Sequence, residues 1–394
     1  MFRCFLFSVA MLFSFSLYAQ NELQVLRAKV VDEKEGEALI GVHVTYADYR
    51  YGTATNSNGD FQIKIEQVER PFDSLRFSYI GYEDLVIPID DELIETTPAV
   101  FQMKAALIGL PSIEVEDITA ETIVRKANEN MSLNYPVEAH TMIGFYREES
   151  QQANLKRTIL FTEGVLEVQK DKLKKSRYQI RDKVAIIKGY RRKIPYNLIT
   201  ENDTVNITPI SQGAYLPAYV DCIRQVNFLF HNNSYKRYDY QYEGIVFMGD
   251  KVLYKIAFQP KSNRQILIYD GILYIEKESF AVVKAEYQYN QRGLDSFNEN
   301  NTTSLDLQYR QFSAQYFQYQ GKWYLEQAKV RQAFKESKTK IPVEIKMDYV
   351  TTEVAPRERE RAVSKWLEFN DVLAASVEAV SEDFWEDYII LKEE

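Results

Sequence analysis

Apolar and polar residues alternate along much of the second half of the chain. In residues 252–258, the apolar side chains of Val252, Tyr254, Ile256 and Phe258 occupy every second position and so share one face of a predicted strand. The same alternation recurs in three later strands, with apolar members Val283, Ala285, Tyr287 and Tyr289; Leu305, Leu307 and Tyr309; and Val343, Ile345, Met347 and Tyr349. One apolar and one polar face are typical of an antiparallel sheet that is covered on one side. Residues 276–279 are predicted to form the turn between two of its strands.

Shorter apolar runs, separated by turn residues, make up residues 21–103. The runs cover residues 25–31, 39–46, 61–65, 75–79 and 85–89. The polar cluster at residues 56–60 and Gly81 mark turns between them. Short strands at this spacing predict a small antiparallel β-sandwich. The predicted fold is therefore mostly β: a seven-stranded sandwich, followed by a larger antiparallel curved sheet or half-barrel with a few helices.

Two segments have a helical pattern. In the first, Ala120, Ile123, Val124, Ala127 and Met131 fall on one face. Asp117 or Thr119 is the expected cap, and the sequence Asn-Tyr-Pro at residues 134–136 ends the helix. The second helix is predicted over residues 218–230, with Cys222, Ile223, Val226 and Phe230 facing inward. We expect residues 104–116 to be a linker with a hinge at Gly109 and Pro111, and residues 117–394 to form the β-rich second domain.

The first nineteen residues have the parts of a secretory signal peptide. Arg3 precedes a short apolar run at residues 4–18, which ends at the small residue Ala19. We expect cleavage after Ala19 and an exported protein, periplasmic or associated with the outer membrane; the alternative is an uncleaved anchor. Cys4 lies at the start of the apolar run, not after it, so a lipid anchor is not predicted.

Composition narrows the function classes. Once the signal peptide is removed, Cys222 is the one remaining cysteine, so an internal disulfide is impossible and a buried thiol is expected. The net charge of −9 argues against binding to nucleic acid or to anionic lipid. No second apolar stretch reaches membrane length. The 28 Tyr and 22 Phe favour strands, and core packing explains them more simply than carbohydrate or peptide binding does.

Four motifs follow one another in the N-terminal segment: GEALIGV at 36–42, GTATN at 52–56, NGDF at 58–61 and FSYIGYE at 77–83. Together they resemble the carboxypeptidase-regulatory-like domain, a transthyretin-like β-sandwich of bacterial envelope proteins. In that family the domain is an accessory module. The resemblance therefore implies an adaptor, without peptidase activity.

The second half has a looser resemblance. The motifs are NYP at 134–136, GFYRE at 144–148, YIEKESF at 274–280 and FWEDY at 384–388. They look like the uncharacterised domain that often follows this sandwich. The long meander, with AVVK at 281–284, is also similar in pattern to half-barrels of the lipoprotein-carrier type. That similarity implies an open, curved sheet with an apolar concave side that helices close in part.

Catalytic and metal-binding motifs are absent from the sequence. His43, His140 and His231 stand outside any zinc-binding spacing, and there is neither a Gly-x-Ser-x-Gly elbow nor a phosphate-binding loop. We therefore predict no catalytic, cofactor-binding or metal-binding residue, and leave the binding residues unknown. A Cys222 nucleophile paired with a distant histidine is disfavoured.

The absence of motifs does not exclude a glycoside hydrolase, because that reaction needs only two carboxylates at a suitable separation. The pairs Glu148-Glu149 and Glu382-Asp383 are interpreted as solvated charge. Residues 56, 58 and 60 alternate oxygen-bearing side chains, but Glu66 lies at the wrong spacing for an EF-type calcium loop, so a plain turn is favoured.

Three functions fit these observations. The leading hypothesis is a non-enzymatic binding or scaffolding protein of the cell envelope, with the sandwich as adaptor and the larger sheet as the surface for an envelope protein or an apolar or glycan ligand. The alternatives are a glycan-acting hydrolase and a purely structural subunit of an outer-membrane assembly. An open concave face would favour a ligand carrier, whereas a packed one would favour the structural role.

Overall fold

The computed structural model describes residues 23–46, 51–56, 58–66, 74–90, 92–93, 98–106, 118–173, 182–200, 204–206, 213–225, 228–261, 268–356, 365–368 and 371–379. The predicted signal peptide, most of the predicted linker, and Glu382 and Asp383 lie outside these residues. The domain boundaries at residues 103 and 117 remain predictions.

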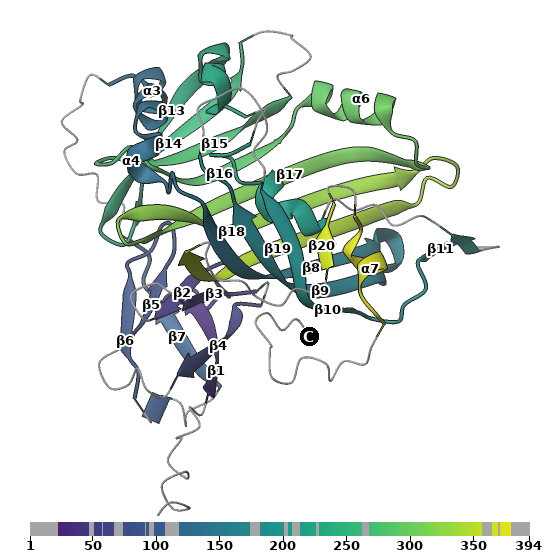
Figure 1. The fold of residues 1–394 in the computed structure, drawn as a ribbon, viewed down its shortest axis with the longest axis horizontal. Helices are drawn as coiled ribbons and strands as arrows, with labels where there is room; N and C mark the ends of the chain where they lie inside the picture. Colours follow the sequence, from purple (N-terminus) through teal and green to yellow (C-terminus); the bar gives the residue numbers. More distant parts are fainter. Residues whose placement is uncertain are drawn as a thin grey trace, which may run out of the picture.

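The N-terminal strands form a seven-stranded β-sandwich, as predicted (Figure 1). They are β1 (Leu23–Asp32), β2 (His43–Tyr46), β3 (Tyr51–Ala54), β4 (Asp60–Glu66), β5 (Ser74–Ser78), β6 (Leu85–Pro88) and β7 (Ala99–Met103). One sheet has the order β4-β1-β7 and the other β3-β2-β5-β6. Phe61, Phe77 and Phe101 meet between the sheets, with ring centroids 4.7 to 6.2 Å apart. This aromatic contact is the centre of the sandwich core.

The second half of the chain forms an open antiparallel sheet with the strand order β13-β14-β15-β16-β17-β18-β19-β8-β9-β10-β20. Its strands are β8 (His140–Gln152), β9 (Arg157–Lys170), β10 (Lys183–Arg191), β13 (Tyr238–Met248), β14 (Lys251–Pro260), β15 (Tyr269–Glu276), β16 (Val282–Tyr289), β17 (Leu305–Tyr319), β18 (Lys322–Glu336), β19 (Pro342–Pro356) and β20 (Lys365–Leu367). A separate hairpin joins β11 (Asn197–Ile199) and β12 (Thr204–Asn206). We call this eleven-stranded structure the large sheet.

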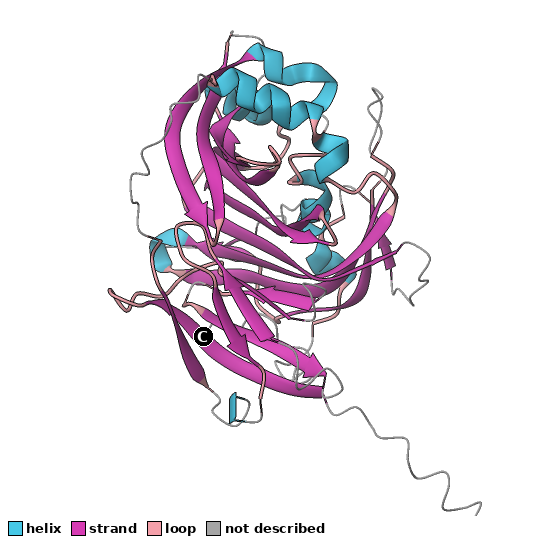
Figure 2. Cartoon of the chain, turned by 90° about the vertical axis from the view of Figure 1, so that its left-hand side faces the viewer, coloured by secondary structure: helices cyan, strands magenta, loops and turns pink. Residues whose placement is uncertain are grey.

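Most of the helices gather on one side of the large sheet, around which the strands curve (Figure 2). They are α3 (Ala120–Glu129), α4 (Met131–Asn134), α5 (Leu216–Tyr219), α6 (Gln291–Asn300) and α7 (Leu373–Ser376), with 3-10 turns η2 (Ala153–Leu155), η3 (Gly213–Tyr215) and η4 (His231–Arg237). The first predicted helix is confirmed at its start, where Thr119 caps α3 by accepting a hydrogen bond from the Thr122 N–H. It ends earlier than predicted, at Glu129, and Met131 belongs to the separate short helix α4, which the Asn-Tyr-Pro sequence ends. None of the described helices is long and apolar enough to cross a membrane.

The second predicted helix is wrong. A single helical turn, α5, ends at Tyr219, and residues 221–225 form turns before η4 begins at His231. Polar Asp221, Arg224 and Gln225 are as buried as Cys222 and Ile223. A helix with one apolar face cannot bury its polar residues as well. Residues 221–225 and 228–230, which we call the irregular segment, are therefore not helical, and their buried polar side chains are hydrogen-bonded to other parts of the chain. Cys222 is buried, as predicted.

The predicted alternation is confirmed in β14, β16 and β19, and the predicted turn lies between β15 and β16. Tyr309 in β17 is the exception, because it is 39% exposed. The register shifts between Leu307 and Tyr309, where a β-bulge inserts one extra residue. Every later side chain of the strand therefore changes face, and Arg310 becomes buried in place of Tyr309.

The sandwich lies against the convex side of the large sheet. β3 pairs with the end of β19 at Tyr51 and Glu353. The β13–β14 turn contacts the loop between β5 and β6, where the Gly81 N–H donates to Phe247 O at 2.6 Å and the Gly249 N–H donates to Tyr82 O at 3.1 Å. All four residues of β2 are buried, because one of its faces meets the sandwich core and the other meets the large sheet.

Candidate functional site

The three histidines lie in separate parts of the fold. His43 is in β2 at the junction with the large sheet, and His140 begins β8 with its ring edge-on to Tyr324. His231 belongs to η4, and its side chain lies outside the described part of the structure. Among the described residues, no group of three or more His, Cys, Asp or Glu side chains could hold a metal ion.

The interpretation of Glu148 as solvated charge is wrong, because its side chain is fully buried in β8. Its carboxylate accepts a hydrogen bond from Tyr146 Oη at 2.9 Å. Glu149 is half-buried and accepts from Thr158 and Gln151. β8 is covered on both faces, so even the acidic residues of this strand are withdrawn from water.

The predicted turn at residues 56–60 is confirmed. Asn56 Oδ1 accepts hydrogen bonds from the backbone N–H groups of Asn58 and Asp60, each at 2.9 Å. The amide oxygen that a calcium loop would use is therefore engaged within the turn itself.

Cys222 lies in the core on the concave side, where its Sγ is 3.2 Å from Tyr316 Oη. Burial raises the pKa of this thiol far above its usual range. A nucleophilic cysteine needs the opposite shift, since the thiolate is the reactive form. Cys222 is therefore a packing residue.

A buried cluster of four charges joins the irregular segment to the large sheet. Lys170 Nζ of β9 lies 2.9 Å from Asp221 Oδ2 and 3.2 Å from Asp182 Oδ2, and Arg224 Nη2 lies 2.8 Å from Asp182 Oδ1. Tyr316 Oη donates to the second Asp221 oxygen. The two positive and two negative charges balance, and each of the four carboxylate oxygens accepts a hydrogen bond. The cluster therefore stabilises one position of the segment over the concave face.

The rest of that segment fills the concave face with aromatic contacts. Phe228 is fully buried, with its ring 4.5 Å from that of Tyr287 and 5.7 Å from those of Phe258 and Tyr269. A hollow of about 20 Å³ remains beside Tyr135 and Asp221. That volume holds about one water molecule. In the described part of the chain, the concave face is therefore occupied by the protein's own side chains.

A larger hollow lies on the convex face. It is a groove of about 660 Å³ across β14 to β18, lined by Phe258, Gln259, Asp270, Gly271, Ile272, Glu286, Tyr287, Gln288, Gln311, Phe312, Ser313, Lys329 and Arg331. We call it the convex groove. Its volume falls within the usual range of small-molecule sites.

The strand register aligns the polar side chains of the convex groove in two rows. One row runs from Glu286 through Ser313 to Lys329, with the apolar Ile272 beside Glu286 at its end. The other runs through Asp270, Gln288, Gln311 and Arg331. Neighbouring strands are about 4.8 Å apart, so each row offers polar groups at a regular spacing.

Positive and negative charges balance in the convex groove. Two acids, Asp270 and Glu286, stand against two cations, Lys329 and Arg331. Arg331 is held by both oxygens of Asp348, at 2.7 and 3.0 Å. Burial raises the pKa of Glu286, but Lys284, whose Nζ lies 2.6 Å from it, and Tyr274 outweigh burial and hold that pKa below its usual value. Burial also lowers the pKa of Lys329, and Asp348 opposes that shift.

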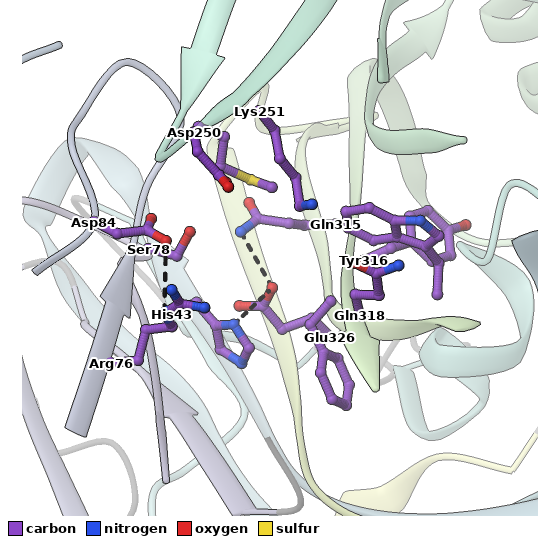
Figure 3. Close-up of a pocket in the computed structure, with 13 residues that line it drawn as sticks. His43, Arg76, Ser78, Asp84, Asp250, Lys251, Gln315, Tyr316, Gln318 and Glu326 are labelled. Atoms are coloured by element: carbon purple, nitrogen blue, oxygen red, sulfur yellow. Dashed lines mark hydrogen bonds and ion pairs between the residues drawn. The ribbon is translucent and has the colours of Figure 1, made fainter. Parts of the chain in front are cut away.

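A second, smaller pocket lies between the sandwich and the large sheet, and we call it the junction pocket (Figure 3). Its volume is about 180 Å³. Figure 3 shows the sandwich residues Arg76, Ser78 and Asp84 on one side, and Gln315 and Glu326 on the other. Gln315 lies two residues from Ser313 along β17, so the junction pocket and the convex groove are neighbours on the same face.

Glu326 and His43 meet in the wall of the junction pocket. Glu326 is the extra residue of a bulge in β18, and its Oε2 lies 3.5 Å from His43 Nδ1. Gln315 and Gln327 each donate a hydrogen bond to the carboxylate. Burial raises the pKa of Glu326 to about 7 and lowers the pKa of His43 to about 3.

Comparison with known proteins agrees with the architecture of the N-terminal strands. Residues 26–115 match the family model of the CarboxypepD_reg-like domain. This carboxypeptidase-regulatory-like domain contains the four motifs that suggested it, and its match ends inside the predicted linker. A search of curated proteins gives no match.

Comparison with solved structures gives matches at low TM-scores. A putative outer membrane lipoprotein-sorting protein domain from Vibrio parahaemolyticus is 11% identical, with a TM-score of 0.30, and the match covers 62% of this chain and 95% of that one. A LolA superfamily protein from Nitrosomonas europaea is 12% identical, with a TM-score of 0.23, over 62% and 96%. A DUF1329 family protein from Desulfovibrio piger is 10% identical, with a TM-score of 0.28, over 61% and 95%. All three TM-scores are too low to indicate a ligand or a function.

Sequence reasoning identified none of the residues that line the two hollows as a site. The one available signal in the sequence is β2, where His43 and Thr45 alternate with Val44 and Tyr46. In the structure all four side chains are buried. A polar face that is buried must meet a partner surface. The sequence does not say which surface that is.

Proposed function

We propose that this chain is a non-catalytic binding protein of the cell envelope that takes up a neutral, polyhydroxylated ligand, such as a short glycan, in its convex groove. The carboxypeptidase-regulatory-like domain acts as an adaptor fixed to the back of the large sheet. The envelope location rests on the predicted signal peptide at residues 1–19.

The observation that carries this proposal is the lining of the convex groove. Amide, hydroxyl and charged side chains from four strands stand in aligned rows, and their formal charges cancel. Such a surface offers both donors and acceptors but has no excess charge to attract an ion. A glycan presents hydroxyl groups of both roles at a similar spacing, and is therefore the ligand class that fits best.

The geometry favours this groove over the concave face. Phe228 and its neighbours occupy the concave side of the described structure, where an apolar ligand would have to bind. It also gives little support to glycan hydrolysis. A general acid needs a raised pKa, whereas Lys284 and Tyr274 hold the pKa of Glu286 low.

The test is a screen of neutral oligosaccharides followed by calorimetry with the best binder. Replacing Gln288 and Gln311 by alanine removes two amide side chains from the second row. Each lost hydrogen bond is worth about 1 kcal/mol, so we expect the dissociation constant of the double variant to rise about thirtyfold.

The matched control is Gln308→Ala. It removes an exposed amide side chain from β17, the strand that also contains Gln311, but Gln308 does not line the groove. Its affinity should equal that of the wild type. The proposal fails if no oligosaccharide binds at millimolar concentration, or if the double variant and the control bind equally well.

A further inference from the structure

The junction pocket is built by three separate parts of the chain. The sandwich contributes Arg76 and Asp84, the β13–β14 turn contributes Asp250 and Lys251, and β17 and β18 contribute the opposite wall, which includes Glu326 (Figure 3). Its volume of about 180 Å³ is well above what a single water molecule needs. An occupant of this size would contact both the sandwich and the large sheet.

The charges of this lining do not balance. Three acidic side chains, those of Asp84, Asp250 and Glu326, stand against two cations, and Glu326 is the weakest acid of the three because burial raises its pKa to about 7. Each cation already has a carboxylate partner: Arg76 Nε lies 3.6 Å from Asp84 Oδ2, and Lys251 Nζ lies 3.2 Å from Glu276 Oε1, which is outside the lining. The pocket therefore has negative charge that its own cations do not neutralise.

Asp84 lacks a full set of partners within the described structure. Its Oδ1 is buried and accepts no hydrogen bond there, although Arg76 and Ser78 contact the carboxyl group. Burial raises the pKa of Asp84, and the nearby Asp250 carboxylate raises it further. A buried acceptor without a donor costs about 1–3 kcal/mol, so a donor that enters beside it would be bound favourably.

The apolar residues of the lining indicate what kind of molecule would carry that donor. Phe317 and Trp323 supply aromatic surface on the large-sheet side, and Met248 supplies an apolar group beside the turn. Aromatic faces attract cations as well as apolar groups. Since no group of three or more His, Cys, Asp or Glu in the described part of the chain could hold a metal ion, an organic cation is the better match.

We propose that the junction pocket binds a small organic amine, with its ammonium group between Asp84 and Asp250 and its apolar body against Phe317 and Trp323. Glu326, on the opposite wall, adds a third acceptor. This site is separate from the convex groove, whose balanced lining suits a neutral ligand. The two proposals therefore stand or fall independently.

Calorimetry with phenethylamine on the full mature chain tests the proposal. 2-Phenylethanol is the matched neutral probe, because it replaces the ammonium group by a hydroxyl and keeps the ring. We expect the amine to bind at least about tenfold more tightly than the alcohol. Its binding should also raise the melting temperature, since the ligand contacts both sides of the junction.

Asp250→Asn should weaken amine binding about tenfold without disturbing the fold, because Asp250 is exposed in a turn. Glu326→Gln should weaken it as well, through a buried carboxylate on the other wall. Asp239→Asn is the control: it changes an exposed acid of β13 that is outside the pocket lining, and should leave the affinity unchanged.

Three results would overturn the assignment. The alcohol could bind as tightly as the amine, which would remove the role of charge. Phenylalanine, which adds a carboxylate to the same amine, could bind more tightly than phenethylamine, which would make the ligand a zwitterion. The third result is that neither phenethylamine nor 2-phenylethanol binds at millimolar concentration, which would mean that the pocket holds only water. Oligosaccharide binding to the convex groove is measured separately and should survive Asp250→Asn.

Discussion

At the scale of single residues, the most unusual pair is Glu326 and His43. Both are almost completely buried, and they come from parts of the chain nearly three hundred residues apart. Burial disfavours the charged form of each, so it raises the pKa of the acid and lowers that of the base. The two side chains therefore affect stability in opposite directions as the pH changes.

We predict that replacing either partner exposes the pH dependence of the other. The folded pKa of Glu326, about 7, lies above its usual 4.5, so its contribution to stability is complete below pH 4.5 and is lost as the pH rises through 7. The folded pKa of His43, about 3, lies below its usual 6.5, so its contribution is complete above pH 6.5 and is lost as the pH falls towards 3. Between pH 4.5 and 6.5 the two slopes oppose each other.

Urea unfolding of the wild type and of Glu326→Gln, from pH 4 to 8, measures this effect. The difference in unfolding free energy, variant minus wild type, should rise by about 1.4 kcal/mol per pH unit between pH 4.5 and 7. His43→Gln should show the opposite slope relative to the wild type below pH 6.5. Parallel curves for all three proteins would show that neither group changes its pKa on folding.

Two residues, Tyr309 and Glu148, lie where the local pattern does not predict them. Strict alternation predicts an inward Tyr309 because it assumes an unbroken register, and the bulge between Leu307 and Tyr309 is not visible in the pattern. The sequence predicts an exposed Glu148 because adjacent acidic residues are usually exposed. Its burial depends on β8 being covered on both faces, which is a property of the whole fold.

At the scale of elements, the irregular segment and the large sheet are joined by the Lys170 cluster. Lys170 is 1% exposed and contacts both Asp182 and Asp221. Lys170→Met keeps most of the apolar part of the side chain but removes its charge. The buried carboxylates of Asp182 and Asp221 then have Arg224 as the one cation left in the cluster. We expect a loss of about 3–5 kcal/mol in unfolding free energy, measured by urea denaturation.

Lys172→Met is the matched control. It removes the same charge two residues away, from an ion pair with Glu138 in which both side chains are more than half exposed. Exposed pairs of this kind contribute about 0–1 kcal/mol, so this variant should be close to wild type. Equal losses in the two variants would mean that the buried cluster does not stabilise the segment.

The two predicted helices show what local pattern can and cannot establish. α3 has an apolar stripe and a threonine cap, and Pro136 follows the short helix α4. Each of these signals acts within a few residues of the helix that it marks. The segment after α5 had an apolar stripe as well, but its polar residues are buried by partners in β9, β16 and β17. Contacts that distant determine the path of the chain and leave no mark on the local sequence.

At the scale of the whole molecule, both hollows arise from the way strands are brought together. The convex groove needs the register of β15 to β18, and the junction pocket needs the sandwich to lie against the large sheet. The sequence could predict that both β structures exist, because alternation and turn residues are local. It could not predict that Asp84, Asp250 and Glu326 would meet, since that depends on contacts between separate elements.

Gly249 is the point at which this arrangement can be tested. It has φ +58°, and a Cβ atom there would lie 2.5 Å from the carboxylate of Asp84. The Gly249→Val side chain would push the β13–β14 turn away from the sandwich and break the hydrogen bonds of Gly81 and Gly249 across the junction. We expect a loss of about 2–4 kcal/mol and, in calorimetry, a separate transition at lower temperature for the sandwich.

Gly36→Val separates the backbone cost from the loss of contact between the sandwich and the large sheet. Gly36 has a similar φ of +69°, but a Cβ atom there would meet nothing within 4 Å. The control should lose only the roughly 1–2 kcal/mol that a left-handed backbone costs, and should still unfold in one transition. If Gly249→Val also unfolds in one transition, the sandwich does not depend on this turn for its position. If it unfolds in two, the turn couples the sandwich to the large sheet, and both sides of the junction pocket are held in place by the same few backbone contacts.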